Sequence, residues 1–324
     1  MNFFVSVIIP AFNVERFIEK TVASALKEPE VLEVVVINDG SFDRTEYILN
    51  KLQNQNPTRI KVYHHENGLN RGRSASRNLG IRKSRANFVA FLDSDDFYLP
   101  SRFKRDKAIF EKVENTEVVY SAVGYHFYRE LKDEEKENFK KLNTVSKPLE
   151  ENDVFKALIS SKYGYLHLNG LTVRKSVFEK IGFFNEALPV AEDSDFIFKL
   201  GFKCKFKAGL IDTPVAIRGI HDENIYDDKD LYKKWNVKLY ESLLSWCYEQ
   251  GASINEIDSV LHWLWLIKLR ENSSLLSYIF YWIGFNFRHP QTILSMFFIK
   301  YFPVFRLRQK LFPFLYSNVK NIFF

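Results

Sequence analysis

The sequence predicts an α/β fold with a mostly parallel sheet flanked by helices, followed by a helical C-terminal region rich in aromatic residues. Short apolar runs with many β-branched residues recur through the first half of the 324-residue chain. Segments with helical spacing separate the first of these runs, and such alternation is typical of parallel sheets. Beyond residue 226 the composition changes, and all five tryptophans lie there.

Five apolar runs are expected to form strands. Each is short and continuous rather than alternating, which suits a sheet that is covered on both faces. The runs are residues 5–10, 33–38, 60–65, 88–93 and 117–123. Because open α/β sheets bind ligands at the carboxyl ends of their strands, we expect function in the loops that follow residues 10, 38 and 93.

Two helices are expected between the first three strands. Apolar residues recur at helical spacing from residue 17 to 26, and Asn13 is a candidate N-cap for that helix. Asp43 is a candidate cap for the second helix, with Glu46 three residues further on. Residues 129–153 are highly charged, so a mobile loop or an exposed helix is expected there.

The C-terminal hundred residues allow two interpretations. Their apolar segments are too short for a membrane-spanning helix, which needs about 18 or more residues. Residues 275–324 either contact a membrane surface as interfacial helices, or form a helical cap or homodimer interface that buries the apolar side chains. The cations that lie among these aromatic residues are Lys300, Arg306, Arg308, Lys310 and Lys320.

Charge and cysteine content limit the class of protein. The formal net charge of +6 favours an anionic partner, such as a phosphorylated substrate or a membrane surface. Cys204 and Cys247 cannot form a disulfide framework, which fits a reducing cytoplasm. The first 13 residues lack a basic segment and a small-residue cleavage site, so no signal peptide is expected. We therefore expect a cytoplasmic protein, free or at the cytoplasmic face of the inner membrane.

Three strand ends carry polar or aromatic residues that fit one ligand. Phe12 follows the first strand, between Pro10 and Asn13, and Asp39 follows the second in a turn that Gly40 makes possible. The motif DSDD follows the fourth strand. An aromatic face, a carboxylate that accepts from a base N–H and a cation site would together suit a nucleoside diphosphate.

The motif DSDD places Asp93, Asp95 and Asp96 within four positions. Unpaired like charges at this spacing repel one another, and a bound cation relieves that repulsion. One of Asp95 and Asp96 could instead cap a helix that begins near Pro100, which would leave two carboxylates unexplained. Oxygen ligands favour a hard cation, Mg²⁺ or Mn²⁺, completed by water and phosphate oxygens.

Seven segments resemble, in order, the motifs of family 2 glycosyltransferases with the GT-A fold. The resemblance covers residues 4–225. It implies an inverting enzyme that moves a hexose or N-acetylhexosamine from a nucleotide-sugar, expected to be a UDP-sugar, to a hydroxyl of a glycan or lipid-linked acceptor in cell-surface polysaccharide or lipooligosaccharide synthesis. The segments are VSVIIPAFNVERFIEKTVASAL, VVVINDGSFDRT, GRSASRNLGI, FVAFLDSDDFYLP, VRKSVFEKIGFFNEAL, AEDSDFIFKL and RGIHDEN.

The resemblance also implies a domain organisation. Residues 1–225 would form the catalytic domain, with the donor bound by its first half and the acceptor by its second. Residues 226–324 would form a helical region that associates with a membrane or dimerises.

The resemblance assigns donor-binding roles to residues of the first four motifs. Phe12 would lie against the base, Asp39 would accept the base N–H, and Arg77 would lie near the base and phosphates. Ser74 is a candidate cap of a helix whose N-terminus favours an anion. The expected donor-binding residues are Pro10, Ala11, Phe12, Asn13, Glu15, Asp39, Ser74, Arg77, Asp93 and Ser94.

The resemblance also assigns the metal and the catalytic base. Asp95 would ligate the metal, His221 would complete its site, and Asp93 would lie nearer the ribose or donor sugar. An inverting displacement needs a carboxylate that takes the proton of the acceptor hydroxyl. Asp193 would have that role, and Glu192 would orient the acceptor. Without a catalytic role, residues 192–195 would simply cap the helix that follows them.

Departures from the family pattern narrow this interpretation. Asn38 stands where the family more often has an acid. No QxxRW motif and no long hydrophobic span follow Glu192 and Asp193, which argues against a processive synthase.

Two other function classes stay open. A nucleotidyltransferase that makes sugar nucleotides should have a glycine-rich loop after the first strand, and PAFNVERF has no glycine. A non-catalytic scaffold could bind a nucleotide, or bind RNA through the basic segment 70–85. Clustered acids at strand ends would repel RNA phosphates, so no nucleic-acid partner is expected.

Overall fold

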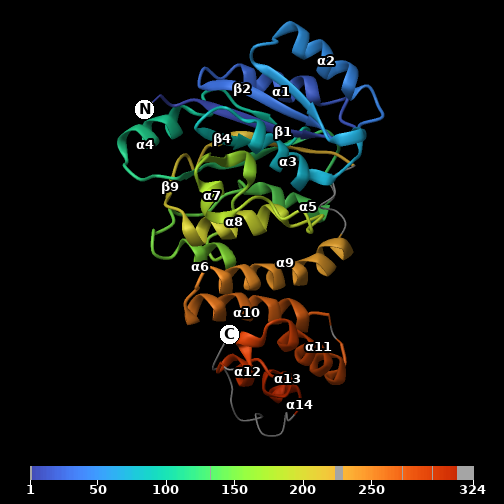
Figure 1. Ribbon diagram of the computed structural model, residues 1–324, viewed down its shortest axis with the longest axis vertical. Coiled ribbons are helices and arrows are strands. Elements are labelled where there is room, and N and C mark those ends of the chain that lie inside the picture. The colour runs from blue at the N-terminus through green and yellow to red at the C-terminus, as the bar shows by residue number, and fades with distance from the viewer. Residues whose placement is uncertain (1, 132, 223–228, 272, 294, 312–324) are drawn as a thin grey trace. The chain divides into compact units, whose positions relative to one another are not determined.

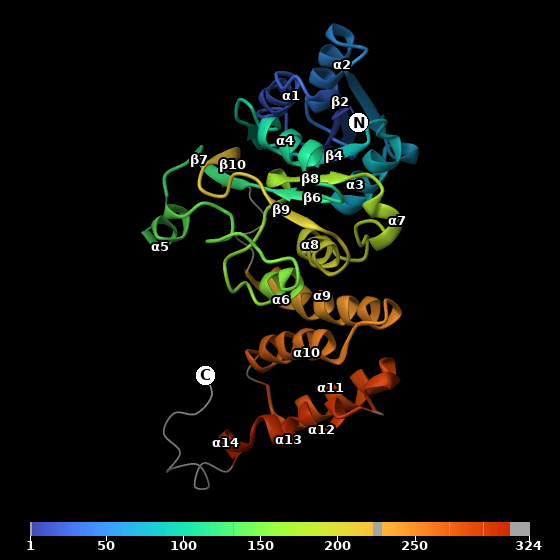
Figure 2. The ribbon, with the colours of Figure 1, turned by 90° about the vertical axis from the view of Figure 1, so that its left-hand side faces the viewer.

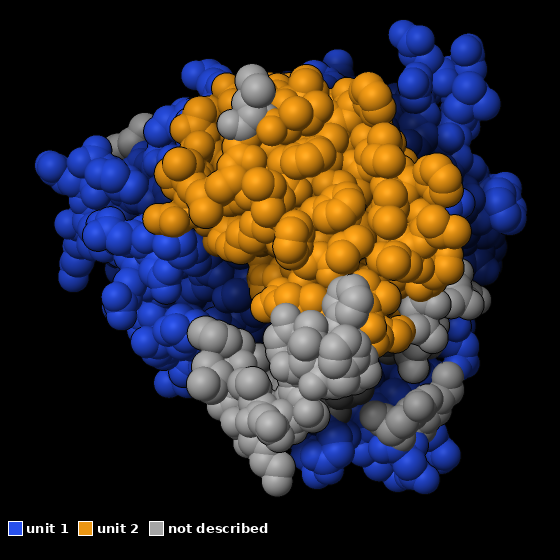
Figure 3. Space-filling model, turned by 90° about the horizontal axis from the view of Figure 1, so that it is seen from below, with its two compact units in different colours: residues 1–235 blue, residues 236–324 orange. Residues whose placement is uncertain are grey.

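The computed structural model describes residues 2–131, 133–222, 229–271, 273–293 and 295–311. The chain divides into two compact units, which are residues 1–235 (unit 1) and residues 236–324 (unit 2), coloured separately in Figure 3.

Unit 1 contains a seven-stranded sheet in the order β3-β2-β1-β4-β8-β6-β9. Figure 1 labels β1, β2, β4 and β9 of this sheet. Pairing is parallel from β3 through β4, while β8 runs antiparallel to β4 and β6. The prediction of a mostly parallel α/β sheet is confirmed. The strands are β1 (Val5–Ala11), β2 (Val31–Asn38), β3 (Ile60–His64), β4 (Phe88–Phe91), β6 (Val118–Tyr120), β8 (Leu171–Arg174) and β9 (Phe206–Ala208).

A second, three-stranded sheet follows the order β5-β10-β7 and was not predicted from the sequence. Its strands are β5 (Phe97–Tyr98), β7 (Ala122–Phe127) and β10 (Pro214–Ile220). The single strand expected at 117–123 is instead two strands, because the chain leaves the large sheet at Ser121. There the Ser121 N–H donates to the carbonyl of Gly170, and the Ala122 N–H donates to that of Leu210.

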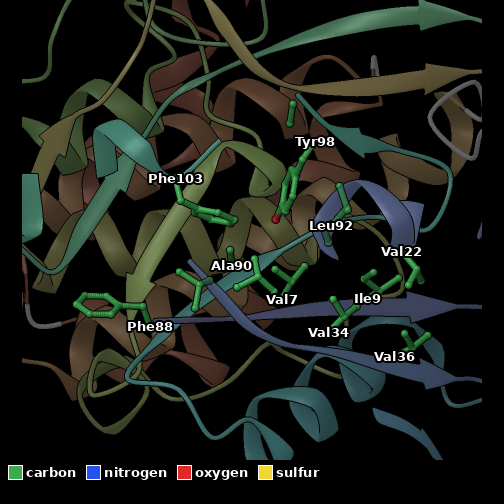
Figure 4. Packing of buried hydrophobic residues seen from close by; sticks show 14 of the residues in the cluster. Val7, Ile9, Val22, Val34, Val36, Phe88, Ala90, Leu92, Tyr98 and Phe103 are labelled. Atoms are coloured by element: carbon green, nitrogen blue, oxygen red, sulfur yellow. The ribbon is translucent and has the colours of Figure 1, made fainter. Parts of the chain in front are cut away.

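Helices cover both faces of the large sheet, as its continuous apolar strands require. On one face, Val5, Val7 and Ile9 of β1 pack with residues of α1, α2 and α4 (Figures 2 and 4). On the other face, Gly80 of α3 lies directly against Ile8, where a Cβ would come within 2.5 Å of its side chain. The α8 side chain of Phe196 packs edge-on against Phe91 on this second face.

The helices of unit 1 are α1 (Ile18–Leu26), α2 (Thr45–Gln55), α3 (Gly72–Lys83), α4 (Lys104–Lys112), α5 (Asp133–Lys136), α6 (Val154–Ile159), α7 (Val177–Ile181) and α8 (Glu192–Lys203). Within residues 129–153, the described part holds only α5 and a single 3-10 turn at Asn138–Lys140 as helical structure.

Several expected helix caps are wrong. Asn13 has φ of 52° and lies five residues before α1, and its side chain accepts from the Phe42 N–H instead. Neither Asp95 nor Asp96 caps a helix, because the next one begins at Lys104. Ser74 lies inside the first turn of α3 rather than at its cap. The Asp43 carboxylate accepts from the Thr45 N–H without being the N-cap.

Unit 2 is helical in its described part. The remaining helices of the described residues are α9 (Lys229–Glu249), which begins in unit 1, and α10 (Ile254–Leu269), α11 (Leu275–Arg288), α12 (Phe297–Lys300), α13 (Pro303–Arg306) and α14 (Arg308–Leu311). Ser253 and Glu256 form a capping box at the start of α10. Trp265 and Trp282 are fully buried and lie in ring contact. Lys320 and the rest of 312–324 lie outside the described residues.

None of the helices in the described part of the chain combines the length and the hydropathy that a bilayer span requires.

Candidate active site

A cavity of about 240 Å³ opens at the carboxyl ends of β1, β2 and β4, within unit 1. This is the edge of the sheet at which the sequence predicted function. Its lining residues are Pro10, Ala11, Phe12, Asn13, Val14, Phe17, Asp39, Arg73, Asp93, Ser94, Asp95, Asp96, Arg218, His221 and Tyr232.

Hydrogen bonds fix the loops after β1 and β2 against each other. The Asn13 N–H donates to Ser41 Oγ at 3.0 Å, and the Val14 N–H donates to Thr45 Oγ1 at 2.9 Å. In return, Glu15 Oε2 accepts from the Arg44 N–H at 2.8 Å. Glu15 therefore ties the two loops together and is not among the residues that line the cavity.

Phe12 presents an aromatic surface beside these loops. Its side chain is 43% exposed, and its ring meets that of Phe42 edge-on, with centroids 5.9 Å apart. A large ring that stays this exposed at a cavity can stack with a planar ligand.

Asp39 is buried between the end of β2 and the start of α3. Its two carboxylate oxygens accept from the Arg71 and Gly72 N–H groups at 2.7 and 2.9 Å, at the start of α3. Gly40 holds the turn that follows, because a Cβ there would come within 2.6 Å of the Gly68 carbonyl. Each Asp39 oxygen keeps a lone pair with which it can accept another hydrogen bond.

Asp95 and His221 face each other in the cavity. His221 Nε2 lies 2.9 Å from Asp95 Oδ2, although the two residues are 126 positions apart in the sequence. Phe17 stacks on the His221 ring at a centroid distance of 4.9 Å, which fixes the plane of the imidazole. An aspartate and a histidine so placed offer one oxygen and one nitrogen ligand.

Asp96 points away from this pair into the protein. Its Oδ1 accepts from the Gly219 N–H at 2.7 Å, and Oδ2 accepts from the Asn169 side chain. Burial raises the pKa of Asp96 well above its usual value, and the charges of Asp95 and Asp93 raise it further. Asp96 thereby connects the DSDD loop to β10.

Arg77 bridges two carboxylates beneath the cavity. Its guanidinium donates to Asp93 Oδ1 and to Glu192 Oε1, each at 2.8 Å, and its side chain is almost fully buried. Burial opposes the charge of Asp93, but the pairing with Arg77 outweighs it and lowers the pKa of Asp93 to about 2. Arg77 is not among the residues that line the cavity, so its observed contacts orient other groups.

Among the residues that the structure describes around the cavity, two sets could hold a divalent cation. Asp95 and His221 line the cavity, whereas the ligand atoms of Asp93, Asp96 and His167 lie within 4.8 Å of one another. Oxygen and imidazole donors in both sets suit Mn²⁺. Both Asp96 oxygens already accept hydrogen bonds, so the Asp95–His221 pair fits a cation better.

Asp193 lies in the first turn of α8 and is half-buried. Its Oδ1 accepts from the Ser194 N–H at 2.7 Å. Asp193 is not among the cavity-lining residues, but it influences one of them: burial raises the pKa of Tyr232, and the Asp193 charge raises it further. Helix α8 begins at Glu192, and its N-cap is Ala191. The prediction that Glu192 caps this helix is therefore wrong.

Several cavity residues were not predicted from the sequence. Arg73 was given no role in the site, and its Nε lies 3.4 Å from Glu192 Oε1. Tyr232 lies beyond the last motif, where no pattern marks it. Burial lowers the pKa of His167, next to the cavity, to about 4, with a further contribution from Arg218. Of the predicted donor-binding residues, Glu15, Ser74 and Arg77 do not line the cavity.

The mostly parallel sheet and the acidic cavity at its strand ends define an α/β protein of the GT-A type. The solved structure of residues 1–349 of TarS from S. aureus, in complex with UDP-GlcNAc, has this fold. It matches 81% of this chain and 70% of its own with a TM-score of 0.59 and 20% identity.

The family model described as glycosyl transferase family 2 matches residues 6–182. This chain belongs to that family. An uncharacterized glycosyltransferase of Rickettsia felis is 32% identical over 197 residues, which is 60% of this chain and 31% of the relative. The minor teichoic acid biosynthesis protein GgaA of Bacillus subtilis is 28% identical over 267 residues, 80% of this chain and 56% of the relative. The chain thus spans about a third and about half of these two relatives.

Proposed function

We propose that this chain is an inverting, metal-dependent glycosyltransferase that moves a sugar from a UDP-sugar to a hydroxyl of a glycan or lipid-linked acceptor. The observation that carries the proposal is the convergence of Phe12, Asp39, Asp95 and His221 on one cavity from four separate segments. Family membership supports the class of reaction. The catalytic domain proposed for residues 1–225 contains every cavity residue except Tyr232.

The donor nucleotide is proposed to bind between Phe12 and Asp39. The exposed Phe12 ring stacks on the base, and an Asp39 oxygen accepts the ring N–H of uracil beside the backbone N–H that it already holds. Arg73 and Arg218 bring positive charge to the cavity, which suits a diphosphate. TarS was solved with UDP-GlcNAc, which supports an N-acetylhexosamine donor here.

Asp95 and His221 are proposed to hold Mn²⁺ or Mg²⁺. Such an ion, when bound, neutralises the negative charge of the departing diphosphate. The residues around it have separate tasks: Phe17 fixes the imidazole plane, and Arg77 orients Asp93 toward the donor. Gly219 and Asn169 fix the loop through Asp96.

Asp193 is the proposed catalytic base. In an inverting transfer, the acceptor oxygen attacks the anomeric carbon from the face opposite the diphosphate, and a carboxylate takes the hydroxyl proton. Asp193 keeps its second oxygen, Oδ2, for this proton, because the Ser194 N–H bonds to Oδ1. Glu192 is buried, and its Oε1 accepts from Arg77 and lies 3.4 Å from Arg73, so we assign it to orienting neighbouring groups rather than to taking a proton.

The similarity to GgaA supports a role in the synthesis of a cell-surface polymer. The other classes are disfavoured by observations on the site. The β1 loop adopts a tight arrangement around Asn13 without the glycine-rich phosphate loop of nucleotidyltransferases. An inactive scaffold would have no use for the Asp95–His221 pair.

The test is turnover of UDP-sugars by the purified chain, measured as UDP release with and without Mn²⁺. The variant Asp193→Asn should lose turnover by a factor of about 10² to 10⁴, the usual contribution of a general base, while calorimetry shows unchanged UDP binding. Asp212→Asn, an exposed carboxylate outside the cavity, is the matched control and should retain activity. Full transfer activity in Asp193→Asn would overturn the assignment of the base.

A further inference from the structure

Helix α11 (Leu275–Arg288) carries apolar residues on two opposite faces. Tyr278, Trp282 and Phe285 are buried in unit 2. On the other side, four large apolar side chains are exposed, with exposed fractions of 66% for Leu276, 70% for Phe280, 45% for Ile283 and 78% for Phe287. We call these four residues the α11 face.

The spacing of the α11 face makes it one continuous stripe. Its residues follow each other at i, i+4, i+7 and i+11, which places them along one side of a helix. An ordinary surface helix has polar residues on the side away from its core. A helix that is apolar on both sides therefore indicates a second apolar environment.

Further exposed apolar residues adjoin the helix. Phe298, which is itself partly exposed, lies in ring contact with Trp282 of α11 at 5.9 Å. Around it in the sequence, Met296 is 66% exposed and Ile299 is 62% exposed. Phe298 and Ile299 belong to α12, labelled in Figure 1, and Met296 is its N-cap, so exposed apolar side chains lie on a second element of unit 2 as well.

The lysines and arginines of this part of the chain are not balanced by acidic residues from the same segment. Residues 272–324 contain no aspartate or glutamate and six lysines and arginines, which equals the formal net charge of the entire chain. In the described residues, Arg308 and Lys310 of this segment are exposed, and Arg288 is exposed as well but pairs with Glu241 at 2.9 Å. An apolar stripe within an acid-free, basic segment is complementary to a surface that combines an apolar interior with anionic groups.

We propose that the α11 face docks the protein onto an anionic lipid bilayer, with α11 lying in the plane of the headgroups. A 14-residue helix is about 21 Å long, shorter than the hydrocarbon core of about 30 Å, so it lies on the membrane rather than crossing it. The aromatic and aliphatic side chains enter the acyl boundary while the cations meet lipid phosphates. A second copy of the chain fits less well, because dimerisation through this segment would bring its cations against their own copies.

This inference goes beyond the proposed function, because it does not depend on which reaction the cavity performs. It is tested by co-sedimentation of the full chain with vesicles of phosphatidylcholine alone or with phosphatidylglycerol added. We expect binding to the mixed vesicles, at least tenfold weaker binding to the neutral ones, and loss of binding as salt is raised.

The variant Phe280→Glu/Phe287→Glu should lower the affinity for mixed vesicles at least tenfold. Ile254→Glu is the matched control, because Ile254 is equally exposed, at 67%, in unit 2 but lies at the start of α10. It should bind like the parent chain. Circular dichroism and the thermal midpoint should be unchanged in both variants, since only exposed side chains are replaced.

Two results would overturn the proposal. One is vesicle binding that is absent from the parent chain or unaffected by the double substitution. The other is a dimer, seen by analytical ultracentrifugation without lipid, that the double substitution dissociates, because the α11 face would then be a subunit interface.

Discussion

Arg77 shows how one residue organises the charges around the cavity. It is nearly fully buried and holds Asp93 and Glu192, which come from the DSDD loop and from the start of α8. A guanidinium has a planar set of donors that can serve two carboxylates at once, whereas an ammonium group is a single point of charge. The donor side and the proposed acceptor side of the cavity are therefore linked through this residue.

The substitution Arg77→Lys should weaken UDP-sugar binding at least tenfold and lower the free energy of unfolding by about 1–3 kcal/mol. The cause is a buried carboxylate that loses its hydrogen bond. Urea denaturation and calorimetry with UDP measure the two effects. Arg82→Lys on the exposed side of the same helix is the control and should change neither. Unchanged UDP binding in Arg77→Lys would show that Arg77 does not position Asp93.

At the scale of elements, the site depends on how β10 and α1 support the DSDD loop. Gly219 of β10 donates its N–H to Asp96, and a Cβ at this position would come within 2.5 Å of the Asp95 carbonyl oxygen. From the other side, the Thr21 hydroxyl of α1 lies within hydrogen-bond distance of the carbonyls of Ser94 and Asp96. The loop is thus held from one side by the backbone of β10 and from the other by a side chain of α1.

The substitution Gly219→Ala should displace the DSDD loop and reduce turnover and Mn²⁺-dependent UDP binding at least tenfold, because the added methyl group forces the Asp95 backbone to move. Gly284→Ala is the control. Gly284 lies inside α11, where a Cβ would meet nothing closer than 3.8 Å, and alanine there should stabilise the helix by about 0.5–1 kcal/mol. Normal metal-dependent binding by Gly219→Ala would show that the loop tolerates this displacement.

A buried ion pair connects α4 to the large sheet. Arg102 and Asp106 are almost completely buried and lie 2.7 Å apart, and Arg102 also donates to the Leu171 carbonyl at the start of β8. Thr172 completes the network by donating to Asp106 at 2.6 Å. Burial raises the pKa of Asp106, so the carboxylate depends on Arg102 to stay charged.

The substitution Arg102→Met should lower the free energy of unfolding by about 3–5 kcal/mol, because it leaves the Asp106 carboxylate buried without its partner. The double variant Arg102→Met/Asp106→Leu should recover part of that loss, since it removes the stranded charge as well. The measurement is a double-mutant cycle, in which urea denaturation gives the free energy of unfolding of the parent, both single variants and the double variant. Equal losses in the single and the double variant would mean that packing by Arg102, not its charge, stabilises this contact.

The sequence predicted the elements of unit 1 better than their long-range pairing. Local patterns identified the strands of β1 through β4, because each is a continuous apolar run. The second sheet was missed because β5 has only two residues and its partners come from far along the chain. The same limit applies to the site. Motifs indicated Asp39 and Asp96, but their hydrogen-bond donors Arg71, Gly72 and Gly219 could be identified only from the structure.

At the scale of the whole molecule, the candidate active site and the α11 face lie in different parts of the sequence. The residues that line the cavity lie between Pro10 and Tyr232, in unit 1. The acid-free segment 272–324 and the α11 face lie in unit 2. Ligands that bind the cavity and lipids that bind the α11 face should therefore act on different parts of the same chain, and their effects can be measured independently.

Ligand-linked stabilisation distinguishes the two candidate metal sites. A ligand that binds only the folded state at 100 times its Kd raises the free energy of unfolding by about 2.7 kcal/mol. We expect UDP with Mn²⁺ to raise the Tm of the parent chain by several degrees, and EDTA to remove most of that increase. In His221→Ala and Asp95→Asn, Mn²⁺ should no longer add to the effect of UDP.

His167→Ala tests the alternative set of Asp93, Asp96 and His167. Because both oxygens of Asp96 are engaged by Gly219 and Asn169, this variant should keep the Mn²⁺-dependent part of the Tm increase. Scanning calorimetry of all three variants at fixed UDP gives the comparison. If His167→Ala abolished the effect of Mn²⁺ while His221→Ala preserved it, the cation would bind on the inner side of the DSDD loop, and the proposed role of the Asp95–His221 pair would be wrong.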